Sequence, residues 1–243
     1  MIRFDSNEYW LKTTWDRYSQ LREVPTKIRE EFLNQEAMLI DSLGVVVNRG
    51  EAHKRIQLLD LACGTGRFSK IVLDLFGTKC IITALDLNQS TLDMAEQVFG
   101  DCVKTVCANA YNVGHMYPCE FDVVICMEFF HHVSQLRILL NSIKDSLKPG
   151  GVLIGSCFLE EKYKEWDRCK YGYTRSFIRS SANSLTKFFY KWMPSTIQAL
   201  VREKGFARIE PVNGDCFIEI LSKDYVLEFE ERNYYLFFRA SLQ

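Results

Sequence analysis

The sequence has 243 residues, of which 47% are hydrophobic and 25% are charged, with a formal net charge of −1. This length is enough for one sizeable core, and the composition is that of a folded protein and not of a disordered one. No apolar run approaches the roughly 18 residues of a membrane helix, and residues 1–6 lack a signal-peptide pattern. The net charge is close to zero, so it gives no general attraction to nucleic acid. We therefore expect a cytoplasmic protein without membrane association.

The first part of the chain, residues 7–44, is predicted to be helical. Thr26 follows a proline and can cap its second half, and Gly44 can end it. Between them, apolar residues recur at spacings of four, seven and four, the pattern of one helix face. We expect residues 1–44 to form a helical lid over a core that spans residues 45–243.

From residue 56 onward, short apolar strands alternate with helices. Strands that are apolar on both faces are typical of a parallel sheet, and the intervening helices are expected to cover both of its sides. The expected strands are residues 56–62, 80–86, 104–108, 121–127 and 152–158, followed by a helix at 195–204 and strand-like segments at 207–212 and 234–239.

Two segments interrupt this alternation. Residues 160–195 are rich in aromatic and basic side chains, whereas residues 213–232 are acidic. The first segment is long enough to be an insertion with its own helical structure. Its composition fits either an apolar pocket with cationic contacts or a helical cap with a solvated basic face.

The segment after the first expected strand carries the strongest chemical signal. It reads Asp60-Leu-Ala-Cys-Gly-Thr-Gly66, and its glycines allow the backbone to approach a ligand at the start of a helix. Asp86 follows 20 residues after Gly66, at the end of the second strand, where an acid can bind both hydroxyls of a ribose. A dinucleotide site is the alternative, but Ser69 stands in place of its third glycine.

Together with four later segments, this loop resembles the class I S-adenosylmethionine-dependent methyltransferases. The later segments are Ala84-Leu-Asp-Leu-Asn88, the pair Asn109-Ala110, the stretch from Phe121 to His132, and Leu147-Lys-Pro-Gly-Gly151. Each match is weak when taken alone. All five stand in the order and spacing of the family, so the resemblance covers residues 56–158.

The resemblance implies an α/β fold with a doubly wound, seven-stranded, mostly parallel sheet. The strand order would be 3-2-1-4-5-7-6 with strand seven antiparallel, and residues 207–212 and 234–239 would be strands six and seven. It also implies a bound S-adenosylmethionine at the carboxyl ends of the strands, where the strand order reverses. Residues 160–195 would then form a second part of the lid, inserted after strand five.

The same resemblance implies the cofactor contacts. Ala62 replaces the first glycine of the family's loop, and Asn109 replaces an acid beside the adenine while keeping an acceptor oxygen. Tyr18 lies in an N-terminal aromatic pattern similar to the lid that covers the cofactor in many members. The expected cofactor-binding residues are Tyr18, Asp60, Ala62, Gly64, Gly66, Asp86, Leu87, Asn109, Ala110 and Met127.

Catalysis of methyl transfer rests mainly on positioning, so a base is needed only for an acceptor that must lose a proton. Glu128, His131 and His132 follow the fourth strand, where the acceptor would meet the methyl group, and they are the candidate catalytic residues. Alternatively, one histidine only orients the loop. We expect no metal site, because adjacent histidines rarely converge on one ion.

The acceptor is expected to be a small molecule that is methylated on oxygen or nitrogen. Tyr173 and Arg175, in the inserted segment, are the candidate substrate contacts, and Arg175 or Arg179 can pair with a carboxylate or phosphate. An RNA or protein methyltransferase with an open basic groove is the alternative, and a cofactor-binding module without catalysis is a third reading. A monomer or a homodimer is expected, and nucleic acid is an unlikely partner.

The nine cysteines form an odd set with no C-x-x-C spacing, which fits neither a disulfide framework nor the usual zinc sites. We therefore expect reduced cysteines that are mostly buried in the strands. The exceptions would be Cys119, Cys169 and Cys216, which fall in loops or insertions.

Overall fold

The computed structural model describes residues 26–49, 54–159, 162, 212–232 and 235–243. The predictions on the first half of the N-terminal helical region, on the bulk of the inserted segment 160–195 and on the helix at 195–204 lie outside these ranges. Within the described ranges, no helix is both long and apolar enough to cross a membrane.

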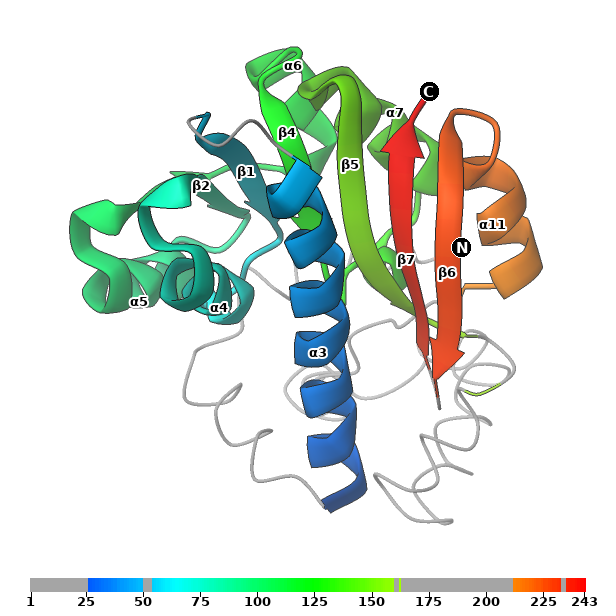
Figure 1. Ribbon diagram of the computed structural model, residues 1–243, viewed down its shortest axis with the longest axis horizontal. Helices are drawn as coiled ribbons and strands as arrows, with labels where there is room; N and C mark the ends of the chain where they lie inside the picture. Colours follow the sequence, from blue (N-terminus) through cyan, green and yellow to red (C-terminus); the bar gives the residue numbers. More distant parts are fainter. Residues whose placement is uncertain (1–25, 50–53, 160–161, 163–211, 233–234) are drawn as a thin grey trace, which may run out of the picture.

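Seven strands form one sheet in the order β3-β2-β1-β4-β5-β7-β6 (Figure 1). The first five strands are parallel, and β7 pairs antiparallel with both of its neighbours. This confirms the expected order and the antiparallel seventh strand. The strands are β1 (Ile56–Leu61), β2 (Cys80–Asp86), β3 (Val103–Cys107), β4 (Phe121–Cys126), β5 (Leu147–Phe158), β6 (Tyr225–Arg232) and β7 (Tyr235–Leu242).

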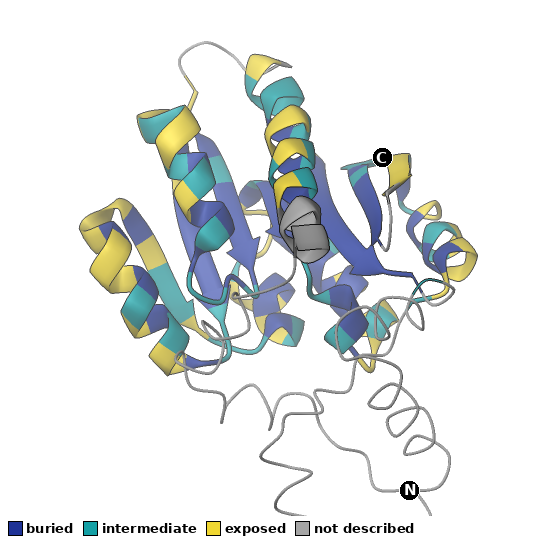
Figure 2. Cartoon of the chain, turned by 90° about the horizontal axis from the view of Figure 1, so that it is seen from below, coloured by how far each residue is buried: buried dark blue, intermediate teal, exposed yellow. Residues whose placement is uncertain are grey.

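The helices lie on both faces of this sheet, and each face has its own buried apolar cluster. Leu58 and Leu59 are neighbours on β1 but belong to different clusters, because successive side chains of a strand point to opposite faces. Figure 2 shows the buried strands between helices whose outer sides are exposed. One face carries α3 (Thr26–Arg49), α4 (Arg67–Phe76) and α5 (Gln89–Phe99), and the other carries α6 (Val113–Met116), α7 (Leu136–Ser146) and α11 (Gly214–Leu221).

Short 3-10 helices complete the connections between these elements. Two of them follow α4 and α5 directly, and two follow the strands β3 and β4 and so lie at the carboxyl edge of the sheet. They are η1 (Gly77–Lys79), η2 (Gly100–Cys102), η3 (Ala110–Asn112) and η4 (Phe130–His132).

Helix α3 packs across β5, β7 and α4, as the blue helix in front of the sheet in Figure 1 shows. The sequence predicted that this helix ends at Gly44, but the helix continues to Arg49. Leu39 and Leu43 lie on its buried face with 0% and 1% exposure. Beyond Gly44, Val46 and Val47 pack against the same apolar cluster, and their burial offsets the roughly 1 kcal/mol that a glycine costs inside a helix.

The assignment of residues 207–212 to strand six was wrong. Strand β6 is Tyr225–Arg232, within the segment that the sequence analysis set aside as acidic, and β7 lies close to its expected place. Of residues 207–212, only Val212 is described, and it forms an isolated parallel bridge with Leu159. The acidic residues of β6 are accommodated because this strand is the edge of the sheet and Glu228 and Glu230 are exposed.

The eight described cysteines are free thiols, but only half of them are buried. Cys107 was expected in a buried strand, yet it is exposed because β3 is the opposite edge of the sheet. Cys102 is also exposed, in η2. The buried thiols are Cys63, Cys80, Cys126 and Cys157, and Cys169 lies outside the described residues.

Candidate functional site

The loop from β1 to α4 turns through three residues in the left-handed region. Ala62 has a φ of 59°, Gly64 of 56° and Gly66 of 77°. A Cβ at Gly64 would have no neighbour within 4 Å in the described part of the chain, whereas a Cβ at Gly66 would lie 2.3 Å from a ring carbon of Phe99. Gly66 therefore lets the loop pack against α5, and Gly64 leaves open space above the loop.

Asp86, at the end of β2, joins the second strand to this loop. Its Oδ2 accepts a hydrogen bond from the Gly64 backbone N–H at 2.8 Å, and its Oδ1 accepts one from the Asn88 backbone N–H at 2.9 Å. Burial raises the pKa of Asp86, and hydrogen bonds from the Asn88, Gly64 and Leu87 backbones and from the Thr91 side chain oppose the rise.

Asp60, at the start of the loop, is buried and hydrogen-bonded to helix α4. It is 1% exposed, and its Oδ2 accepts hydrogen bonds from the backbone N–H and the hydroxyl of Ser69, at 3.0 and 2.7 Å. Gly66 caps α4 without a side chain, so Asp60 supplies the acceptor that the first turn of this helix needs. The structure thus places this expected cofactor residue beneath the loop, where it supports α4.

The loop after β3 lies beside Asp86. The Ala108 backbone N–H donates to the Asp86 carbonyl at 2.9 Å. The Asn109 Oδ1 accepts from the Tyr111 backbone N–H at 3.0 Å and so caps η3. Ala110 is buried, and Leu87 is partly exposed. The ends of β2 and β3 therefore bring Asp86, Leu87 and Asn109 to one edge of the sheet.

The loop after β4 begins with buried Met127 and continues with Glu128 in the left-handed region, at a φ of 60°. The Glu128 backbone N–H donates to the Ser156 hydroxyl on β5 at 3.1 Å. A non-glycine residue in this conformation costs about 1–2 kcal/mol, and such strain is characteristic of functional sites.

The two histidines of this loop are poor bases in the structure. His131 is 2% exposed, and its Nδ1 accepts from the Phe158 backbone N–H at 3.4 Å. The ring proton therefore lies on Nε2, which is 3.9 Å from Oε2 of Glu128. Burial lowers the pKa of His131 well below its usual value and lowers that of His132 to about 4.

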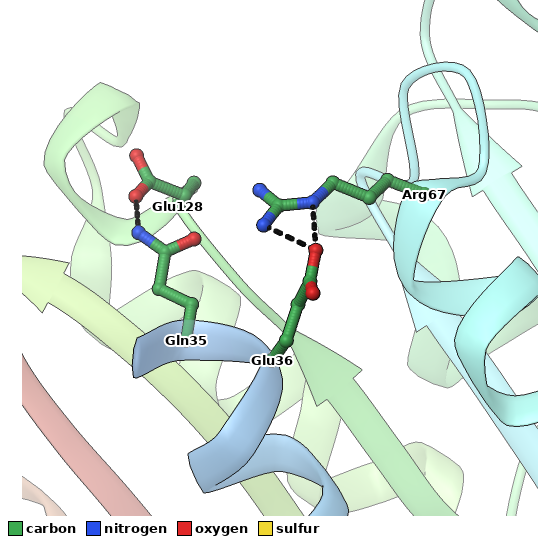
Figure 3. A network of polar contacts seen from close by, with 4 residues as sticks. All are labelled: Gln35, Glu36, Arg67 and Glu128. Atoms are coloured by element: carbon green, nitrogen blue, oxygen red, sulfur yellow. Dashed lines mark hydrogen bonds and ion pairs between the residues drawn. The ribbon is translucent and has the colours of Figure 1, made fainter. Parts of the chain in front are cut away.

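Helix α3 contacts both loops through two consecutive residues, which the sequence analysis did not identify (Figure 3). The Gln35 Nε2 donates to the Glu128 Oε1, in the loop after β4. The Arg67 Nε and Nη2 both donate to the Glu36 Oε1, at 3.0 and 2.7 Å, at the start of α4. One signal in the sequence could have indicated this contact. Gln35 is a polar residue four positions before Leu39, so it lies on the buried face of the helix.

These contacts bring most of the expected site residues to one edge of the sheet. The residues fit an adenosyl ligand, because the Asp86 carboxylate contacts the Gly64 backbone and no described atom would lie within 4 Å of a Cβ at Gly64. Tyr18, Tyr173 and Arg175 lie outside the described residues.

Comparisons with known proteins agree with this geometry. Residues 59–155 match the family model described as a methyltransferase domain. A malonyl-[acyl-carrier protein] O-methyltransferase of Priestia megaterium is 23% identical over 179 residues, which cover 73% of this chain and 61% of the relative. A ubiquinone biosynthesis O-methyltransferase of Idiomarina loihiensis is 28% identical over 127 residues, 51% of each chain. The chain therefore spans between half and two thirds of the length of these relatives.

Solved structures show the same fold at low sequence identity. The N-methyltransferase NodS of Bradyrhizobium japonicum, in complex with S-adenosylhomocysteine, matches with a TM-score of 0.58 and 14% identity, over 98% of this chain and 96% of that one. The 1,6-didemethyltoxoflavin-N1-methyltransferase of Burkholderia thailandensis matches with a TM-score of 0.54 and 15% identity, over 89% and 83% of the two chains.

Proposed function

Because the chain contains a class I S-adenosylmethionine-dependent methyltransferase domain, we propose that it transfers a methyl group to an oxygen or nitrogen atom of a small molecule. The main support is the contact of Asp86 with the Gly64 backbone, which places a carboxylate at the end of β2 directly beside the glycine loop. When bound, S-adenosylmethionine supplies an electrophilic methyl group.

The residues around this loop have separate roles in the proposal. Asp86 binds the two ribose hydroxyls, and Asn109 offers its remaining acceptor and donor capacity to the adenine. Asp60 holds the first turn of α4, so that the helix N-terminus faces the ligand. Each of these residues acts by positioning, which is the main contribution of the protein to a displacement at carbon.

Glu128 is the residue that we propose as the proton acceptor for a hydroxyl or ammonium nucleophile. Glu128 follows the end of β4, whose neighbour in the sheet is β1, the strand that leads into the glycine loop. His131 is less suited, because the Phe158 N–H occupies its Nδ1 and its Nε2 carries the proton. His131 then orients Glu128, and His132 has too low a pKa to act as a strong base.

The relatives support oxygen as the acceptor atom, since two of them are named as a malonyl-[acyl-carrier protein] O-methyltransferase and a ubiquinone biosynthesis O-methyltransferase. The N1-methyltransferase structure supports nitrogen as the alternative atom only through its shared fold. The proposed reaction is therefore methyl transfer to an oxygen or a nitrogen atom.

The experiment is a calorimetric titration with S-adenosylhomocysteine. Asp86→Ala should bind at least about 100-fold more weakly than the wild type, because two hydrogen bonds to a carboxylate are worth about 1.5–3 kcal/mol each. Asp93→Ala removes an exposed carboxylate from α5 and is the matched control. Equal affinity of Asp86→Ala and the wild type would contradict the site.

Methyl transfer is tested with S-adenosylmethionine labelled in the methyl group. The acceptors are a panel of phenols, hydroxy acids and amines, together with tRNA and a protein mixture. The proposal expects label in small molecules and a lower kcat for Glu128→Gln at unchanged cofactor affinity. Transfer only to the tRNA or protein would contradict it.

A further inference from the structure

One buried polar atom near the proposed site has no role in the function described so far. Gln35 is 0% exposed, and its Nε2 donates to Glu128, but its Oε1 has no hydrogen-bond partner among the described residues. A buried carbonyl without a partner is strongly unfavourable, and the same helix face continues with Leu39 and Leu43. An apolar residue would fill this position without that penalty, so the amide calls for a functional explanation.

The orientation of the Gln35 amide follows from its partner. An ionised carboxylate only accepts hydrogen bonds, so the nitrogen of the amide must face Glu128 and the oxygen must face away from it. Figure 3 shows this oxygen directed toward the side of Glu36 and Arg67. Arg67 directly follows Gly66, so the oxygen lies between the glycine loop and the loop of Glu128.

A group that binds this oxygen has to be a hydrogen-bond donor. The Gln35 Oε1 and the Glu128 carboxylate are separated by a single amide nitrogen, so the pair offers two neighbouring acceptors. A ligand that satisfies both carries two neighbouring N–H or O–H groups. The oxygen is closed off from water, so such a ligand reaches it only after the groups that cover Gln35 have moved.

We propose that Gln35 is a specificity-determining residue that selects a methyl acceptor with a second hydrogen-bond donor next to the reacting atom. This inference rests on the proposed function and narrows its substrate class. Glu128 takes the proton of the reacting hydroxyl or amine, and the Gln35 Oε1 accepts a hydrogen bond from the neighbouring donor. The ammonium of the bound cofactor is the other possible source of a donor, and the experiment separates the two.

The experiment measures binding of simple probes to the full chain saturated with S-adenosylhomocysteine. Catechol carries two adjacent hydroxyls, whereas phenol and guaiacol carry one each and bracket catechol in size. The wild type should bind catechol about tenfold more tightly than either of them. Gln35→Met should reduce this preference to less than about threefold, and Leu39→Met, one turn along the same buried face, should retain it.

The outcomes separate this inference from the proposed function. Equal binding of the three probes by the wild type, or no binding of any, overturns the inference even if methyl transfer to the panel is found. A preserved preference in Gln35→Met together with about tenfold weaker S-adenosylhomocysteine binding assigns the oxygen to the cofactor and also overturns it. Unchanged S-adenosylhomocysteine affinity with a lost preference supports it, and thermal melting checks that Gln35→Met is folded.

Discussion

Asp60 on β1 caps α4 through two hydrogen bonds from Ser69, although the two residues belong to different elements. Both groups are buried, with exposures of 1% and 0%. This pair explains why the loop can end in Gly66 without losing the acceptor that a helix N-terminus needs.

Ser69→Ala removes one of the two donors to Asp60 and leaves a buried carboxylate with a single hydrogen bond. We expect the free energy of unfolding to fall by about 1–3 kcal/mol, measured by urea denaturation. Ser134→Ala, at an exposed position, is the control and should change it by less than about 0.5 kcal/mol. A Ser69→Ala variant as stable as the control would show that the Asp60 cap is not needed.

Asp60 should also make stability depend on pH. Burial raises its pKa from 3.8 to about 6, against the effect of the Ser69 hydrogen bonds. The folded protein therefore retains this proton between about pH 4 and pH 6, whereas the unfolded chain has lost it. The resulting stabilisation is present below about pH 4 and is lost as the pH rises through about 6.

Asp60→Asn tests this dependence because asparagine does not titrate. The stability of the wild type relative to Asp60→Asn should fall by about 3 kcal/mol between pH 4 and pH 7. Comparing the two proteins cancels the contributions of other groups, including His131 and His132, whose lowered pKa values act in the opposite direction. Denaturant titrations at several pH values measure the difference, and a constant difference would refute the assignment.

Gly66→Ala separates backbone strain from steric conflict. Gly66 and Gly100 both have a positive φ, but only at Gly66 would a Cβ meet Phe99, at 2.3 Å. Gly100→Ala should cost about 1–2 kcal/mol from strain alone, and Gly66→Ala about 2–5 kcal/mol because overpacking adds to it. Thermal and urea unfolding measure the stability of both variants. Equal losses of stability in the two variants would show that the contact with Phe99 adds no cost at Gly66.

Ala62→Gly should stabilise the protein. Ala62 has a φ of 59°, which costs about 1–2 kcal/mol for a residue with a Cβ. Glycine removes this cost, but it also stabilises the unfolded chain by about 0.4–1 kcal/mol through its greater conformational entropy. We expect a net gain of up to about 1 kcal/mol in urea denaturation. Ala95→Gly, inside α5, is the control and should lose about 1 kcal/mol or more.

The sequence predicted the sheet well where strands are buried on both faces. The strand order, which the family resemblance implied, is confirmed, and the first five strands lie close to the apolar runs that alternate with helices. The alternating acidic pattern of β6 was missed, since an edge strand does not need two apolar faces. Cys107 was assigned to the interior for the same reason, because the pattern of β3 does not reveal that it is an edge.

The site was predicted in part. The motifs predicted the place of Asp86 and Glu128 at the ends of β2 and β4, but they contain no signal for the Ser69 contact of Asp60 or the Phe158 contact of His131. The Gln35 and Glu36 contacts join residues that lie 93 and 31 positions apart in the sequence. Such contacts depend on how α3 docks on the sheet, which a pattern of local spacing does not contain.

The order of the last two strands affects how the sheet can be assembled during synthesis. β6 is made before β7, yet among the described strands its only neighbour in the sheet is β7, which lies between β5 and β6. Until β7 is made, β6 therefore has no partner strand in this sheet, and the edge of β5 is open. Both can be completed only after Tyr235–Leu242 has emerged, because β7 pairs with β5 and with β6.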